Sequence, residues 1–139
     1  MASKIKVFAG NYDKKEFYSY MGEVFALKEF RKELPYLCNE PGRVWFLAFE
    51  GKQLIGFASF QETRTKIVFQ NDYVFLKHRG KGVYKQLMDY RLQHIKGKNK
   101  PIEVICNCLK IAEAYIKHGF KETKKTKNYI FMRKDGCHE

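Results

Sequence analysis

The fold of this chain is decided by the stretch Tyr73-Val74-Phe75-Leu76-Lys77-His78-Arg79-Gly80-Lys81-Gly82-Val83-Tyr84, in which a hydrophobic run meets a helical pattern across a basic turn. Gly80 and Gly82 are one residue apart, and this spacing lets the backbone turn tightly and approach a ligand closely. A helix that begins directly after them points unpartnered N–H groups and the positive end of its dipole toward the turn. Because Arg79 and Lys81 add positive charge, the stretch predicts an anion site between a strand and a helix.

The rest of the chain shows alternating and helical patterns around this turn. Apolar alternation and turn residues predict strands at 4–9, 43–50, 53–62, 66–76, 102–106, 120–123 and 128–133. Helices are predicted after a cap at Asp13, with Gly22 as a break between two helices, and then at 82–95 and 109–118, where Gly119 ends the last. This order predicts an α+β fold, a mixed central sheet flanked by helices.

Length and composition favour one domain over residues 1–139, because 45% hydrophobic content in 139 residues can bury a core. No apolar run approaches the roughly 20 residues of a membrane span. Four cysteines without an export signal lead us to expect free thiols and a cytoplasmic protein. A formal charge of +12 suits a polyanionic partner, such as a cofactor phosphate, nucleic acid or an acidic protein.

Three segments together resemble the GNAT N-acetyltransferase superfamily. The run Arg79-Gly80-Lys81-Gly82-Val83 after a strand resembles its pyrophosphate-binding motif. Residues 114–120 resemble its second helix, with the ending Tyr-x-x-x-Gly-Phe, and residues 45–58 resemble its hairpin. The resemblance covers 44 to about 134 in the right order, whereas the first 43 residues match only in general layout.

This resemblance implies an acetyl-CoA-dependent N-acetyltransferase that acts on a primary amine by direct attack. It also implies that the fourth and fifth strands splay apart, and that backbone amides near the end of the fourth strand orient the cofactor and bind its carbonyl oxygen. The expected cofactor-binding residues are Tyr73, Val74, Phe75, Arg79, Gly80, Lys81, Gly82, Val83, Tyr84 and Asn107.

Two of these residues depart from the superfamily pattern. Tyr84 stands where a second Gly or Ala is usual. On a helical wheel it shares a side with Leu87 and Met88, so its ring either packs under the helix or crowds the phosphate site. Asn107 is eight residues before Tyr115, about one more than the common spacing, and a cap for the next helix is an equal interpretation.

Tyr115 and Asp72 are the candidate catalytic residues. Tyr115 matches the tyrosine of the superfamily and is expected to protonate the departing thiolate, with a buried tyrosine of the helix's apolar stripe as the alternative. Asn71 and Asp72 are polar residues in an apolar strand, which indicates a bulge that would expose one of them. Asp72 is either a base or the ion-pair partner of Arg91.

Cys106 and Cys108, with His118, Cys137 and His138, suggest a metal site, but no second close cysteine pair completes it, and none is expected. Two further functions stay open. The same fold could modify a base in DNA or RNA, or it could be a binding module that has lost the cofactor. The acceptor and the oligomeric state have no recognisable pattern in the sequence.

Overall fold

The computed structural model describes residues 3–34 and 37–135. Its elements, in chain order, are β1 (Lys4–Phe8), α1 (Lys14–Ala26), α2 (Lys28–Glu33), β2 (Val44–Glu50), β3 (Gln53–Glu62), β4 (Ile67–Val74), the 3-10 turn η1 (Leu76–His78), α3 (Val83–His94), β5 (Ile102–Cys106), α4 (Leu109–Lys117), β6 (Lys121–Lys125) and β7 (Ile130–Lys134). The predicted order of strands and helices is therefore confirmed, with η1 added before the glycine turn.

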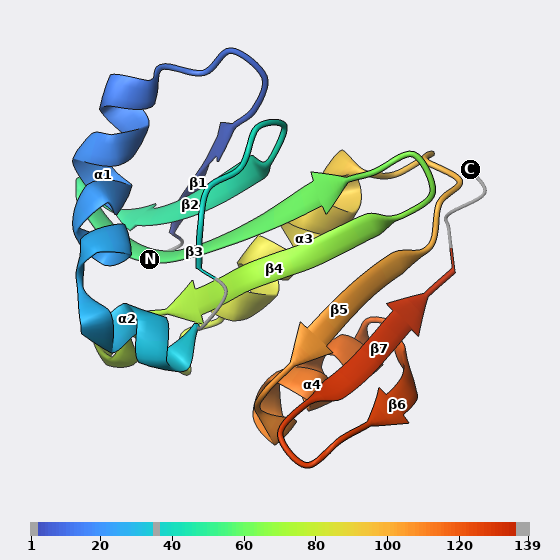
Figure 1. Cartoon of the computed structure of the whole chain (residues 1–139). Coiled ribbons are helices and arrows are strands. Elements are labelled where there is room, and N and C mark those ends of the chain that lie inside the picture. Colours follow the sequence, from blue (N-terminus) through green and yellow to red (C-terminus); the bar gives the residue numbers. More distant parts are fainter. Residues whose placement is uncertain (1–2, 35–36, 136–139) are drawn as a thin grey trace.

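The described residues form one seven-stranded sheet with the order β1-β2-β3-β4-β5-β7-β6 (Figure 1). In this part of the chain β4 and β5 are parallel, and the other neighbouring strands are antiparallel. A parallel pair needs a crossover connection, which α3 supplies between β4 and β5. The sheet is mixed and flanked by helices, so the predicted α+β fold is confirmed.

The helices cover the sheet on two faces. Successive side chains of a strand point to opposite faces, so β2 supplies both cores. Trp45 and Leu47 pack in one cluster with Phe17 of α1, whereas Phe46 and Ala48 pack in the other with residues of α3 and α4. The aromatic stripe of α1 is thus part of a core, as its helical spacing indicates.

The break between the first two helices lies at a different residue from the predicted one. Asp13 caps α1 as expected, since its carboxylate accepts a hydrogen bond of 3.1 Å from the Glu16 amide. The helix continues through Gly22 to Ala26, and the break before α2 lies at Leu27, which is extended (φ −83°, ψ 131°). An isolated glycine weakens a helix without ending it, and Gly22 was therefore wrongly predicted as the break.

The strands β4 and β5 part from each other toward their carboxyl ends. They pair only from Ile67 to Phe69 on β4 and from Ile102 to Val104 on β5. A bulge follows on β4, because Ser59 faces Gln70 while Phe57 faces Tyr73, and Asn71 has φ 60°. The predicted bulge and the splay implied by the resemblance are both confirmed. A bulge bends its strand, which favours this divergence.

Gly56 of β3 lies against β4 just where the bulge ends. A Cβ atom at this position would lie 2.9 Å from the Tyr73 carbonyl oxygen. Because that atom is backbone and cannot move aside cheaply, Gly56→Ala should lower the free energy of unfolding by about 1–3 kcal/mol. Gly22→Ala is the control, since no atom lies within 4 Å of its added Cβ, and it should stabilise by roughly 0.5–1 kcal/mol. Urea denaturation compares the two, and equal stabilities would contradict the close contact.

Candidate functional site

The glycine turn has the geometry of an anion cradle. Gly80 and Gly82 have φ +81° and +83°, a region that residues with a side chain rarely adopt. Both are exposed, and no atom lies within 4 Å of where a Cβ would stand. The helix α3 begins directly afterwards at Val83, and its N-cap Gly82 supplies no side-chain hydrogen bond. The first amides of α3 therefore open onto free space, where they can bind a phosphate group.

A cavity of about 340 Å³ lies beside this turn. Its lining includes Lys81, Gly82 and Lys85 from the turn and α3, with Ser3 and Glu50 from the other side. The ammonium group of Lys85 is 2.9 Å from the Asp89 carboxylate, whereas the exposed Lys81 lies between the two glycines of the turn. The predicted strand, basic turn and helix therefore meet in one place that fits an anionic group.

The end of β4 presents one backbone amide toward the gap beside β5. The Phe75 amide donates to the Ile55 carbonyl of β3 at 2.9 Å, so this amide is already bonded. Successive amides along a strand point to opposite edges, which directs the Val74 amide to the side of β5. The described part of β5 does not pair with this part of β4. Of the three amides predicted near Tyr73 to Phe75, that of Val74 is best placed to donate to a ligand.

The side chains of Tyr73, Val74 and Phe75 have structural neighbours on both faces of the sheet. Val74 is buried against α3, while Tyr73 and Phe75 lie 5.5 Å and 5.8 Å from the Phe30 ring of α2, between centroids. Arg79 folds back onto the same strand end: its Nε donates to the Val74 carbonyl at 2.7 Å, and its guanidinium lies 5.3 Å from the Tyr73 ring centroid. The contact predicted between Arg79 and phosphate stays a prediction.

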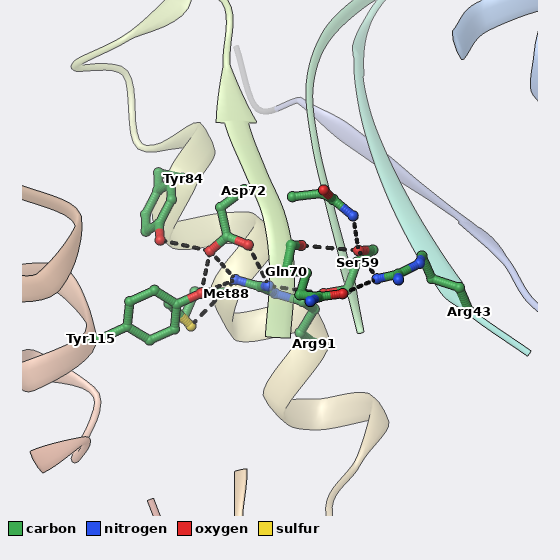
Figure 2. Close-up of polar contacts among 9 residues, drawn as sticks. Arg43, Ser59, Gln70, Asp72, Tyr84, Met88, Arg91 and Tyr115 are labelled. Carbon is green, nitrogen blue, oxygen red and sulfur yellow. Dashed lines mark hydrogen bonds and ion pairs between the residues drawn. The ribbon is translucent and has the colours of Figure 1, made fainter. Parts of the chain in front are cut away.

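Behind the gap lies a buried ion pair between Asp72 of β4 and Arg91 of α3 (Figure 2). Arg91 is fully buried, and its Nη1 and Nη2 each donate to one carboxylate oxygen at 2.7 Å. The ion-pair interpretation of Asp72 is confirmed. Asn71 and Asp72 are only 7% and 9% exposed, so the expectation that the bulge exposes one of them is wrong. Burial of this carboxylate is possible because Arg91 neutralises it.

Two tyrosines complete the cluster around Asp72. The Tyr84 hydroxyl donates to Oδ2 of Asp72 at 2.8 Å, and the Tyr115 hydroxyl donates to the same oxygen. Arg91 Nη2 in turn donates to the Tyr115 hydroxyl at 3.1 Å. Figure 2 shows these side chains converging from β4, α3 and α4. The ring of Tyr84 packs against the same core cluster as Leu87, which confirms the packing interpretation for this residue.

The environment keeps both phenols protonated. Burial, reinforced by the Asp72 charge, raises the pKa of Tyr84 well above its ordinary value. Burial likewise raises the pKa of Tyr115, although the Arg91 charge opposes it. For Arg91, burial lowers the pKa, but Asp72 together with Tyr115 and Tyr84 outweighs burial and raises it, so the guanidinium stays charged. The cluster thus holds one negative charge, one positive charge and two phenolic protons.

The structure also bears on the metal site considered at Cys106 and Cys108 and on the helix cap considered at Asn107. Burial, with the Asp72 charge, raises the pKa of Cys106 to about 12, so its thiol is neutral and not a ready metal ligand. Within residues 3–34 and 37–135, no three His, Cys, Asp or Glu side chains gather as metal ligands; Cys137 and His138 lie outside the described residues. Asn107 is exposed after β5, and Cys108 holds the N-cap position of α4, so the capping interpretation of Asn107 is wrong.

A second polar network lies beside the cluster and was not predicted. Arg43, directly before β2, is 3% exposed, and its Nη1 donates to the Gln70 side-chain oxygen at 2.5 Å. Ser59 connects the two networks, because its hydroxyl accepts from Arg43 at 3.4 Å and its carbonyl accepts from Arg91 at 3.2 Å (Figure 2). The burial of Arg43 could have been inferred from the sequence, because in the strand predicted at 43–50 it alternates onto the same face as Trp45.

Comparisons with known proteins agree with this geometry. A family model described as an acetyltransferase (GNAT) domain matches residues 8–131. Among solved structures, Escherichia coli ElaA is 16% identical, with 96% of this chain and 99% of that chain covered and a TM-score of 0.76. An acyl-CoA N-acyltransferase from Pseudomonas aeruginosa is 16% identical over 96% and 99% of the two chains, with a TM-score of 0.77.

A third structure, the paia N-acetyltransferase from Thermoplasma acidophilum in complex with coenzyme A, is 18% identical over 97% and 99% of the chains, with a TM-score of 0.66. At these identities the three structures show a shared fold. No curated protein matches this sequence. The helices of the described residues are all too short or too polar to cross a membrane.

Proposed function

We propose that this chain, which belongs to the GNAT acetyltransferase family, transfers an acetyl group from acetyl-CoA to a primary amine. The observation that carries the proposal is the cradle at Gly80 and Gly82, open to solvent and followed at once by the uncapped first turn of α3. An amide-lined anion cradle beside two parting strands suits an elongated ligand with a phosphate group. That the Thermoplasma acidophilum protein was solved with coenzyme A supports the choice of ligand.

Some groups of the chain would bind the cofactor, and others would take part in the acetyl transfer. The amides of Gly80, Gly82 and the first turn of α3 would bind phosphate, and Lys81 would add a charge. The Val74 amide would donate a hydrogen bond to a carbonyl oxygen and stabilise the negative charge that develops on it. Acetyl-CoA would supply the acetyl group as a thioester. These backbone groups already lie at a strand end and at a helix start.

Bond changes in the proposed reaction leave two protons to account for. The amine nitrogen forms its bond to the acetyl carbon while the bond from that carbon to sulfur breaks. The amine must shed a proton, and the departing thiolate must gain one. Tyr115 is the proposed donor, because Asp72 and Arg91 hold its protonated hydroxyl beside the place where β4 and β5 part. The amine proton leaves to water, and water then returns one proton to the Tyr115 phenolate, so the proton count balances.

Asp72 acts in this proposal as a positioning residue. Its carboxylate accepts from both guanidinium nitrogens of Arg91 and from the hydroxyls of Tyr84 and Tyr115. A carboxylate with four donors holds the Tyr115 ring in place. The alternative role of Asp72 as a base stays a prediction, and it would require the carboxylate to give up some of these bonds.

Exposed lysines favour an acceptor that is neutral or acidic. On α4 and around β6, the exposed lysines for which no ion pair is seen among the described residues include Lys110, Lys117, Lys121, Lys124, Lys125 and Lys127. They surround the C-terminal half of the sheet and would repel a polycationic acceptor such as a lysine-rich tail. We therefore propose a small amine or an amine on an acidic molecule as the acceptor.

Acetyl-CoA should stabilise the folded chain. At about 100 times its Kd, a ligand adds roughly 2.7 kcal/mol of stability, which corresponds to a rise in Tm of ~5–10 °C for a domain of this size. A thermal-shift titration with acetyl-CoA and with coenzyme A measures this directly. No rise with either compound at millimolar concentration would disprove the proposed function.

A substitution in the glycine turn tests whether acetyl-CoA binds there. Gly82→Asn tolerates a positive φ but places a side chain in the cradle, so it should weaken acetyl-CoA binding ~10-fold or more. Gly10→Asn is the matched control, because Gly10 also has positive φ (60°) and open space but lies in the loop before α1. If both variants keep the parent's affinity, the cradle is not the phosphate site.

A further inference from the structure

The gap between β4 and β5 is spanned by side chains where the ladder of hydrogen bonds has ended. Pairing stops at Phe69, and Asp72 lies three residues beyond it on β4. Tyr84 and Arg91 reach Asp72 from α3, and Tyr115 reaches it from α4, the helix that follows β5. We call Asp72, Tyr84, Arg91 and Tyr115 the bridging cluster, because it connects the two parts of the sheet at their separation (Figure 2).

Tyr84 is the outer member of the bridging cluster. It stands in the first turn of α3, two residues after Gly82 of the anion cradle. Its ring meets that of Tyr115 edge to face, with centroids 6.4 Å apart and an interplanar angle of 84°. Arg91 and Tyr115 are fully buried, whereas Tyr84 is partly exposed. Tyr84 therefore separates the cradle from the buried members of the cluster.

We propose that Tyr84 is a gate: its hydroxyl, held by Asp72, closes the gap between β4 and β5, and coenzyme A binding requires this hydrogen bond to break. The inference rests on the proposed function and adds a step to it. A ligand that binds only the open arrangement has its apparent affinity reduced by the fraction of open molecules. Tyr84 would thus set how readily the cofactor enters.

The remaining contacts allow this gate to open without unfolding. When Tyr84 leaves, Asp72 still accepts two bonds from Arg91 at 2.7 Å and one from Tyr115, so its charge stays paired. Only side-chain rotation at a partly exposed position is needed, and such rotations are fast. Opening would also remove the Tyr84 ring from its edge-to-face contact with the fully buried Tyr115.

The test measures coenzyme A binding to the parent chain and to Tyr84→Phe, which keeps the ring and removes the hydrogen bond. Stopped-flow association and calorimetry should show an association rate ~10-fold higher and a tighter Kd, because a bond to a charged carboxylate no longer opposes opening. Tyr84→Ala removes the ring as well and should raise the association rate at least as much. Tyr90→Phe, an exposed tyrosine of the same helix, is the control and should match the parent.

The outcomes separate the gate from the proposed function. If Tyr84→Phe and Tyr84→Ala bind coenzyme A at the parent's rate or more slowly, the gate is disproved while the cofactor site stands. If the parent and every variant fail to bind coenzyme A, the proposed function fails and the gate fails with it. Faster association in both variants, with Tyr90→Phe unchanged, supports the gate.

Discussion

Asp72→Ala should lower the free energy of unfolding by about 3–5 kcal/mol, the largest stability effect expected in this chain. The substitution leaves the charged guanidinium of Arg91 fully buried without a counter-ion, and an uncompensated buried charge is strongly destabilising. Two phenols also lose their acceptor. Urea denaturation monitored by circular dichroism measures the change.

Two comparisons make this prediction specific. Asp89→Ala breaks exposed contacts with Lys85 on the same helix and with His118, and it should change stability by less than about 0.5 kcal/mol. Replacing both partners, as Asp72→Leu with Arg91→Met, should be less damaging than Asp72→Ala, because no charge is left buried. An Asp72→Ala variant as stable as Asp89→Ala would mean that water reaches Arg91 and that the cluster is not sealed.

Much of the fold could be predicted because its signals are local. The strands at 53–62 and 102–106 have the predicted limits, since apolar runs and turn residues mark both ends. The break between α1 and α2 could not be placed, because glycine marks many breaks but Gly22 adopts helical angles here. What ends α1 is the extended backbone of Leu27, a residue whose type gives no such signal.

The candidate site could be predicted only where a sequence motif or the position of a residue on a helical wheel indicates it. The glycine turn has its own sequence pattern, and the polar Asp72 opposite an arginine on an apolar helix face indicated the ion pair. By contrast, the contacts of Asp72 with Tyr84 and Tyr115 join residues 12 and 43 positions apart. Such long-range contacts depend on how α3 and α4 pack, which no local pattern encodes.

Tyr115→Phe should reduce turnover ~100-fold or more while the Kd for acetyl-CoA stays near the parent value. The change removes the proposed proton donor and leaves the ring, which packs on Phe69 and Phe120. Stability should fall by only about 1 kcal/mol for the lost hydrogen bond, because Asp72 keeps its two bonds to Arg91. Thiol release from acetyl-CoA with a panel of primary amines measures turnover, and calorimetry measures Kd.

Tyr12→Phe is the matched control for this prediction. Its hydroxyl accepts a hydrogen bond of 2.9 Å from Asn39, so the variant loses one partly buried hydrogen bond far from the bridging cluster. It should show a similar loss of stability and unchanged turnover. If Tyr115→Phe also turns over at the parent rate, the proton must come from water or from the attacking amine. The hydroxyl of Tyr115 would then have a structural role alone, because its hydrogen bonds with Asp72 and Arg91 connect α4 to β4 and α3.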